Sequence, residues 1–265
     1  MAAQSKIGRV YGWKPQLPDF RDIKFKEKVK VADIVTTTLF DKYNIPPIYD
    51  QGQLGSCTGN AGAGILQFAL MNKSATPNPS ASLFYPSRLF IYYNERLAQH
   101  TVDQDSGATI RECIQALKKY GACSENLLPY DIARFTDKPS DACYAQGKNF
   151  EISSYQCLDN TNRGSLVAAL ASGHPIEFGF TVYESFESAE VARTGIVPMP
   201  GPDEEVLGGH AVSIFGYNAT GNYYICRNSW GNGWGINGYF HMPAAYIENE
   251  NLCSDFWIIN FKASS

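Results

Sequence analysis

The sequence predicts an α+β fold with two lobes, because helical and strand-like patterns occupy different halves of the chain. The 265 residues are 44% apolar and 18% charged, a globular composition that can supply a sizeable core. We expect a leader over residues 1–40 and one folded domain over residues 41–265. Within that domain, residues 41 to about 145 should be mainly helical and residues from about 146 to 265 mainly strand.

The helical half is predicted from three segments. Ser56 is a good N-cap, and apolar residues recur behind it on one helical stripe. Two further helices are predicted over residues 83–97 and 108–120. Gly121 should end the last of these helices, since glycine adopts the conformation of a helix C-terminal cap most readily.

The second half contains short runs typical of strands, interrupted by one helix predicted over residues 165–171. The predicted strands lie at residues 149–158, 175–183, 210–218, 223–228, 238–242 and 255–261. Functional sites often lie in the cleft between two such lobes.

Composition and charge exclude several classes of function. The net charge of −4 provides no basic face for nucleic acid, and no stretch approaches the 18 apolar residues of a membrane-spanning helix. The N-terminus lacks the apolar run of a secretory signal, which favours a soluble, cytoplasmic protein over a secreted one. Seven cysteines without a Cys-x-x-Cys spacing and only four histidines argue against a zinc site, so we expect no metal and no cofactor.

Cys57 and His210 are the two residues with the clearest chemical potential. Cys57 lies in the first turn of a predicted helix, where the helix dipole and free N–H groups favour a thiolate. His210 begins a predicted strand after Gly208-Gly209, which permits close approach of a ligand. Each also has a plain structural interpretation, as a small buried residue and as a core histidine.

Two further residues could assist them. Asn228 ends the strand that should pair with the His210 strand, so antiparallel pairing would place its amide beside the imidazole and fix the tautomer. Trp230 could then shield this pair from water. Gln51 lies six residues before Cys57, and its side-chain N–H could face a developing oxyanion together with the Cys57 backbone N–H.

The four residues occur along the chain in the order Gln51, Cys57, His210 and Asn228, and the motifs around them resemble those of papain-like cysteine peptidases. The segment Gln51-Gly52-Gln53-Leu54-Gly55-Ser56-Cys57 resembles the Gln-Gly-x-x-Gly-Ser-Cys segment of that family. Gly208-Gly209-His210 resembles its histidine strand, and Asn228-Ser229-Trp230-Gly231 resembles its asparagine motif. The three motifs span residues 50–239.

The resemblance implies a helical left lobe, an antiparallel β-barrel right lobe and an active-site cleft between them. It implies a thiolate nucleophile at Cys57, an imidazolium and general acid at His210, an orienting amide at Asn228 and an oxyanion donor at Gln51. The reaction would be cysteine-type endopeptidase hydrolysis through a thioester, with peptides or proteins as substrates and a monomeric enzyme. The implied substrate-binding residues are Gly107, Ala108, Thr109, Ile110, Gly179, Gly209 and Trp230. From the first five, we expect an apolar pocket for the second residue before the scissile bond.

The chain departs from the family at several positions. Thr58 follows the nucleophile where the family usually has tryptophan, and Leu54 and Asp105 stand where the family has a disulfide. The missing bridge suits a reducing compartment, although bridges among Cys113, Cys123 and Cys143 remain open.

The leader over residues 1–40 lacks a helical period and should be extended. Since relatives often carry an N-terminal segment in the cleft, it could inhibit the enzyme, with Trp13 or Leu17-Pro18 as plugs. It could equally form a terminal strand on the back of the barrel. Other thiol enzymes, namely a transglutaminase-like enzyme or a cell-wall amidase, and a non-catalytic relative are the alternative functions.

Overall fold

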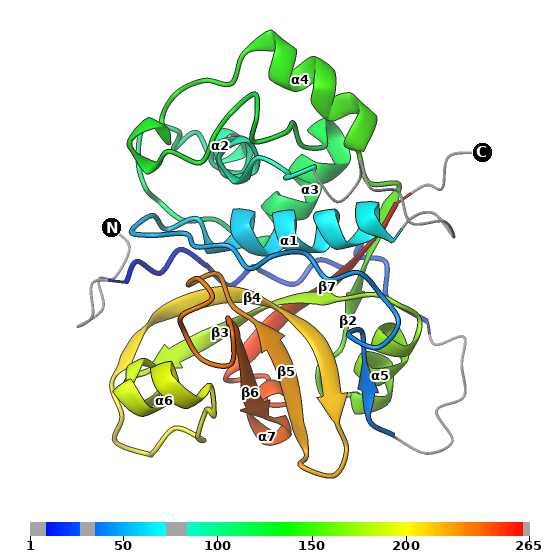
Figure 1. Cartoon of the computed structure of the whole chain (residues 1–265), viewed down its shortest axis with the longest axis vertical. Coiled ribbons are helices and arrows are strands. Elements are labelled where there is room, and N and C mark those ends of the chain that lie inside the picture. Colours follow the sequence, from blue (N-terminus) through cyan, green and yellow to red (C-terminus); the bar gives the residue numbers. More distant parts are fainter. Residues whose placement is uncertain (1–8, 27–34, 73–83, 262–265) are drawn as a thin grey trace.

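The computed structural model describes residues 9–26, 35–72 and 84–261. Most of the lysine-rich stretch and the predicted helix start at residue 83 lie outside these ranges. The described chain has two parts, as Figure 1 shows: helices α1 to α4 lie on one side, and a sheet flanked by α5, α6 and α7 lies on the other. The predicted α+β class and its two lobes are therefore confirmed.

The helical lobe surrounds its first helix. Its helices are α1 (Cys57–Met71), α2 (Arg88–Ala98), α3 (Ile110–Tyr120) and α4 (Asp141–Gly147), with short 3-10 turns at Ile132–Arg134 and Lys148–Phe150. The predicted first helix is present and its apolar stripe is buried, but the buried surface is wider than the stripe, because thirteen of the fifteen residues of α1 are buried. The helix lies between α2 and α3 on one side and the sheet on the other, so all its faces are covered.

The end of α3 is as the sequence predicts, whereas the start of α1 lacks the expected capping hydrogen bond. Ser56 occupies the N-cap position of α1, but its hydroxyl contacts the Tyr130 hydroxyl at 2.6 Å and makes no capping hydrogen bond. The start of α3 is closed by a capping box between Thr109 and Glu112. Gly121 ends that helix at a φ of 63°, as predicted.

The second lobe is an antiparallel sheet in the order β2-β7-β3-β4-β5-β6, with the short β1 on β4. Its strands are β1 (Thr37–Thr38), β2 (Ser154–Leu158), β3 (Ile176–Tyr183), β4 (Val206–Asn218), β5 (Tyr223–Arg227), β6 (Tyr239–Pro243) and β7 (Cys253–Asn260). Over the described residues β2 and β6 do not pair with each other, so the sheet is open and the implied closed barrel is not formed.

Three helices cover the sheet lobe: α5 (Arg163–Ala171), α6 (Ala189–Thr194) and α7 (Ala244–Ile247), with a 3-10 turn at Glu184–Glu187 before α6. Only α5 was predicted, because α6, α7 and α4 are too short to show a helical period. The sheet packs its apolar face around Phe178, Phe180 and Phe240, while a second core joins α1, α2 and α3. The N-terminus of α1 meets β4 where these two cores adjoin, and this junction positions the candidate site.

Candidate active site

Cys57 is the first residue of α1 and is fully buried. Backbone hydrogen bonds from Ala211, Gly12 and Thr58 to its thiol lower the thiol pKa, but burial outweighs them and raises it to about 12. The thiol is therefore neutral with the leader in place. One of its three backbone donors comes from the strand residue that follows His210, and another comes from the leader.

His210 and Asn228 lie side by side on neighbouring strands. Pairing of β4 with β5 places Ser213 opposite Arg227, so Asn228, just beyond the end of β5, reaches back toward His210. The distance from His210 Nε2 to Asn228 Oδ1 is 2.8 Å. The other ring nitrogen, Nδ1, is buried without a hydrogen-bond partner among the described residues. The asparagine thus fixes one nitrogen and leaves the other for a reacting group.

Burial shapes the charge of this histidine. Desolvation lowers the pKa of His210 to about 4, although the hydrogen bond to Asn228 raises it. The indole of Trp230 stacks on the imidazole with ring centroids 5.0 Å apart, as the sequence suggested. With the leader in place, burial favours a neutral thiol and a neutral imidazole, whereas the resemblance implies a thiolate and an imidazolium.

Gln51 is buried in the loop before α1, six residues before the nucleophile. Its side-chain Nε2 donates to the Leu54 carbonyl at 3.0 Å and to the Val10 carbonyl at 3.4 Å. Its Oε1 accepts from the Ser229 hydroxyl at 2.7 Å, so the amide orientation is fixed from both lobes. The amide that should serve an oxyanion therefore faces a carbonyl oxygen of the leader.

The leader crosses this site in an extended form, between α1 and the strands β3 and β4 (Figure 1). The Trp13 N–H donates to the Gly209 carbonyl at 3.1 Å. The Ala108 N–H donates to the Gly12 carbonyl at 2.8 Å, and the Lys14 N–H donates back to Ala108 at 3.0 Å. The leader is thus bound through its backbone to both walls, one from each lobe.

Gly12 lies where the leader passes closest to the nucleophile. A Cβ added at Gly12 would lie 1.7 Å from the Gly55 carbonyl oxygen, and one at Gly107 would lie 2.0 Å from the Gly12 carbonyl oxygen. Gly107 also has a φ of 67°, which favours glycine. The close fit of the leader backbone therefore requires glycine on both sides.

Most of the predicted substrate-binding residues line the path of the leader. Gly179 lies under the Trp13 ring, whose nearest atom would be 2.0 Å from an added Cβ. Gly107, Ala108 and Gly209 contact the segment as described above, and the Trp230 ring lies against Tyr11 with centroids 6.4 Å apart. Thr109 caps α3, and Ile110 is buried in the helical core, so both support the wall from behind.

Two carboxylates that the sequence did not single out receive the leader's aromatic side chains. The Trp13 indole Nε1 donates to Asp255 Oδ2 at 3.1 Å, and the Gln16 N–H donates to the same oxygen at 3.1 Å. Burial raises the pKa of Asp255 to about 6. On the other side of the nucleophile, the Tyr11 hydroxyl donates to the Glu187 carboxylate. Asp255 begins a predicted strand, and Glu187 lies outside every predicted element, so neither belongs to a recognisable motif.

A second pair of carboxylates lies behind the nucleophile. Thr58 Oγ1 donates to Glu95 Oε2 at 2.7 Å, and the Cys113 thiol donates to the Thr58 carbonyl at 3.5 Å. Burial raises the pKa of Glu95 to about 8, and that of Glu177 well above its usual value. Neither oxygen of Glu177 has a partner among the described residues. Thr58, which stands where the family usually has tryptophan, thus belongs to a buried polar cluster with Glu95 and Cys113.

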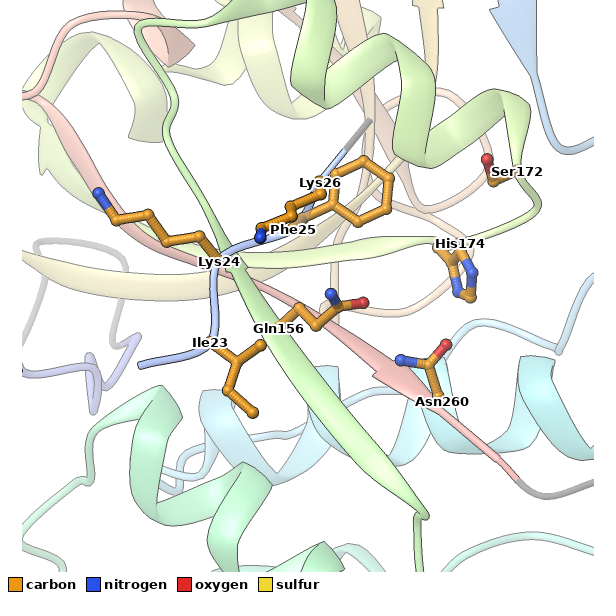
Figure 2. A pocket seen from close by; sticks show the side chains of 8 residues that line it. All are labelled: Ile23, Lys24, Phe25, Lys26, Gln156, Ser172, His174 and Asn260. Atoms are coloured by element: carbon orange, nitrogen blue, oxygen red, sulfur yellow. The ribbon is translucent and has the colours of Figure 1, made fainter. Parts of the chain in front are cut away.

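The leader continues beyond the site along the outside of the sheet. Arg111 pairs with Asp22, and residues 23–25 add backbone hydrogen bonds to Cys157 of β2. Figure 2 shows residues 23–26 passing over β2 and lining a cavity of about 520 Å³ with Gln156, His174 and Asn260. None of the predicted catalytic residues lines this cavity.

All seven cysteines are unpaired, so the bridges left open among Cys113, Cys123 and Cys143 are not formed. The thiols of Cys123 and Cys143 are nevertheless within hydrogen-bond contact. None of the helices in the described ranges is long and apolar enough to span a bilayer.

Comparison with known proteins agrees with this geometry. Residues 36–255 match the family described as papain family cysteine protease. The chain belongs to the papain family of cysteine proteases. It is therefore a hydrolase whose substrates are peptides or proteins, which decides against the transglutaminase-like and amidase alternatives.

Individual relatives extend this assignment over nearly the whole chain. An uncharacterized peptidase C1-like protein of Acanthamoeba polyphaga mimivirus is 41% identical, over 96% of this chain and 88% of its own length. The crystal structure of xylellain, a cysteine protease from Xylella fastidiosa, superposes with a TM-score of 0.85 at 38% identity, over 95% of this chain and 96% of xylellain. Procathepsin B S9 from Trypanosoma congolense, at 16% identity over 96% of this chain and 87% of its own, shares the fold with a TM-score of 0.72.

Proposed function

We propose that the protein is an endopeptidase that cleaves peptide bonds through a thioester at Cys57 and that its N-terminal segment inhibits it. The observation that carries the catalytic assignment is the 2.8 Å contact of His210 with Asn228, one residue from the Ala211 N–H that faces the Cys57 thiol. A nucleophile, a base and an orienting amide are thus supplied by α1, β4 and the end of β5.

The reaction follows from these positions. When the leader leaves, water and substrate enter and the burial that keeps both groups neutral is relieved, so the thiol proton can pass to His210 Nδ1. The sulfur attacks the peptide carbonyl, and the oxyanion accepts from Gln51 Nε2 and the Cys57 N–H. His210 returns its proton to the leaving amine, and the resulting thioester is hydrolysed by a water that His210 activates.

The leader inhibits because it occupies the cleft without presenting a cleavable bond. A substrate runs from Gly107 and Gly179, on its acyl side, to the leaving amine beside His210. The leader runs the opposite way, with Tyr11 against His210 and Trp13 against Gly179. It offers the Gly12 backbone hydrogen bond to the sulfur.

Replacement of the nucleophile tests the catalytic assignment. We expect Cys57→Ala to keep the fold and to lower cleavage of casein and of small fluorogenic peptides by at least about three orders of magnitude. Circular dichroism and thermal unfolding check the fold. Cleavage by the Cys57→Ala protein at the wild-type rate would refute the assignment.

A substitution at Gly12 tests the inhibition better than removal of residues 1–40. Thr37 and Thr38 pair with β4, and Leu39 is buried in the sheet core, so a deletion to residue 40 would damage the sheet. Gly12→Val should open the cleft, because its side chain would overlap the Gly55 carbonyl. Overpacking of this kind costs about 1–3 kcal/mol, so turnover of a fluorogenic peptide should rise roughly 5- to 150-fold.

Gly201→Val is the matched control. At Gly201 an added Cβ meets nothing closer than 3.5 Å, and the residue is not among the proposed site residues. Turnover should be unchanged in this control. If both variants turn over substrate like the wild type, the leader does not inhibit.

A further inference from the structure

Tyr11 occupies a site of its own beside the proposed general acid. Its ring lies edge-on to His210 with centroids 6.0 Å apart and is tilted against Trp230 at 6.4 Å. A Cβ on Gly208 would lie 2.8 Å from the Tyr11 Cβ, so the ring fits only because Gly208 lacks a side chain. We call this set of walls, formed by Gly208, His210 and Trp230 with Glu187 at the end, the Tyr11 site.

The end of the Tyr11 site is a carboxylate that requires a donor. Glu187 is 7% exposed with the leader in place, and one of its oxygens accepts from the Tyr11 hydroxyl. Its other oxygen, Oε2, is buried with no hydrogen-bond partner among the described residues. Burial raises the pKa of Tyr11 well above its usual value, so the phenol stays protonated and acts as the donor. A ligand without a donor would leave a buried carboxylate unsatisfied.

The position of the Tyr11 site relates it to a definite residue of the substrate. His210 delivers the proton to the leaving amine, so a side chain that packs against His210 and Trp230 belongs to the residue that carries this amine. That residue is the first one after the scissile bond. This step depends on the proposed function, because it uses the catalytic role of His210.

We propose that Glu187 is a specificity-determining residue that selects substrates with tyrosine immediately after the scissile bond. The leader's Tyr11 shows the fit, since its ring fills the space beside Trp230 and its hydroxyl reaches the carboxylate. Phenylalanine has the same ring but leaves Glu187 without a partner. An acidic side chain would place a second negative charge against it.

The test uses the full-length chain opened by Gly12→Val and two internally quenched peptides. The peptides are identical except for tyrosine or phenylalanine after the scissile bond, and mass spectrometry verifies the cut. A hydrogen bond to a charged acceptor discriminates roughly 10- to 100-fold, so kcat/KM should favour the tyrosine peptide by at least tenfold. Glu187→Leu in the same background should reduce the ratio to about one or below.

Two further variants keep the test decisive. Glu187→Gln preserves the shape and one neutral acceptor, so it should fold even if Glu187→Leu does not and should lower the ratio severalfold. Glu190→Gln removes an exposed carboxylate three residues away, paired with Arg193, and should leave the ratio unchanged. A ratio near one with Glu187 present, or a high ratio that persists without it, would overturn the proposal.

Failure of the proposed function would look different. If the opened chain cleaves neither peptide nor casein, the proposed function fails, and the role of Glu187 fails with it because that role depends on cleavage at this site. If the opened chain cleaves both peptides equally, the proposed function stands and the role of Glu187 is refuted.

Discussion

Carboxylates lie on two sides of Cys57, and the two sides differ in what surrounds them. On the front, toward the leader, Asp255 and Glu187 each accept from an aromatic side chain, Trp13 and Tyr11 respectively. On the back, Glu95 accepts from Thr58 and from the Cys113 thiol, and neither oxygen of Glu177 has a hydrogen-bond partner among the described residues.

The two pairs of carboxylates should therefore have different roles, the front pair in control of activity and the back pair in stability of the fold. The front carboxylates are covered by the leader, whose departure from the cleft is proposed above, so changes there should alter enzyme activity. The back carboxylates are enclosed by α1, α2, α3 and β3, so changes there should alter the stability of the whole fold. Variants of the two pairs should therefore separate into two groups with different measurable effects.

Glu95→Gln should give the largest change, and it should appear in stability. The folded-state pKa of Glu95 is about 8 against an ordinary 4.5, so the folded state binds a proton that the unfolded state releases. Stability therefore falls as pH rises from about 4.5 to about 8, on the order of 5 kcal/mol in all. The variant lacks this loss and should be more stable than wild type at pH 8.

Thermal unfolding at several pH values measures this difference. The two proteins should converge toward pH 4, where Glu95 is protonated in both states. Glu177 retains part of the slope, since its pKa is also raised. An exposed residue supplies the control, because Glu250→Gln should follow the wild-type curve. Parallel curves for Glu95→Gln and wild type would show that this carboxyl titrates normally.

Trp13→Ala should give the largest change on the front. Trp13 is 8% exposed and packs on Gly179, and removal of a buried tryptophan side chain costs about 3–5 kcal/mol in a core. Trp13→Ala removes contacts that exist only in the closed form, so the closed form loses stability relative to the open form. Turnover should therefore rise on the order of 100-fold, or until the cleft is fully open. The melting temperature of the folded domain that follows the leader should change little.

The leader itself provides the control for this variant. Phe20 belongs to the same segment but is 98% exposed, so Phe20→Ala should leave peptide turnover at the wild-type level. Equal turnover for Trp13→Ala and Phe20→Ala would mean that the Trp13 contacts do not hold the leader.

The placement of Cys57 and the contact of His210 with Asn228 could be predicted from the sequence, because a helix start and local strand pairing determine them. Cys57 begins α1, and the β4–β5 hairpin places Asn228 beside His210. The carboxylates could not be predicted in the same way. Asp255 and Glu187 meet leader residues more than 170 positions away, and no local pattern records such a contact.

The fold was predictable to a similar degree. Long elements with clear periodicity were found, whereas the four-residue α7 has too few residues to show one. The apolar stripe expected on α1 is only part of its buried surface, because the helix is covered on every side and has no polar face. Closure of the sheet depends on pairing between distant edge strands, which strand patterns alone do not specify.

Tyr11→Phe should have a smaller effect on the front, because only a hydroxyl is lost. The Glu187 carboxylate would then lack its donor in the closed form, and a hydrogen bond to a charged group contributes about 1.5–3 kcal/mol. Turnover should rise roughly tenfold or more, less than for Trp13→Ala. Tyr85→Phe, at a side chain 38% exposed, is the matched control. Wild-type turnover for Tyr11→Phe would show that Glu187 does not help to hold the leader.

Asp22→Asn should have the smallest effect, because it changes only the outer attachment of the leader. Asp22 pairs with Arg111 on α3, and both side chains are partly exposed, at 16% and 17%. Partly exposed ion pairs contribute up to about 1 kcal/mol, so turnover should rise at most about fivefold. Added salt should raise wild-type turnover in the same direction and should affect the variant less, since the pair is already broken. If Asp22→Asn opened the cleft as strongly as Trp13→Ala, the outer ion pair would dominate closure and the front carboxylates would not be the main site of control.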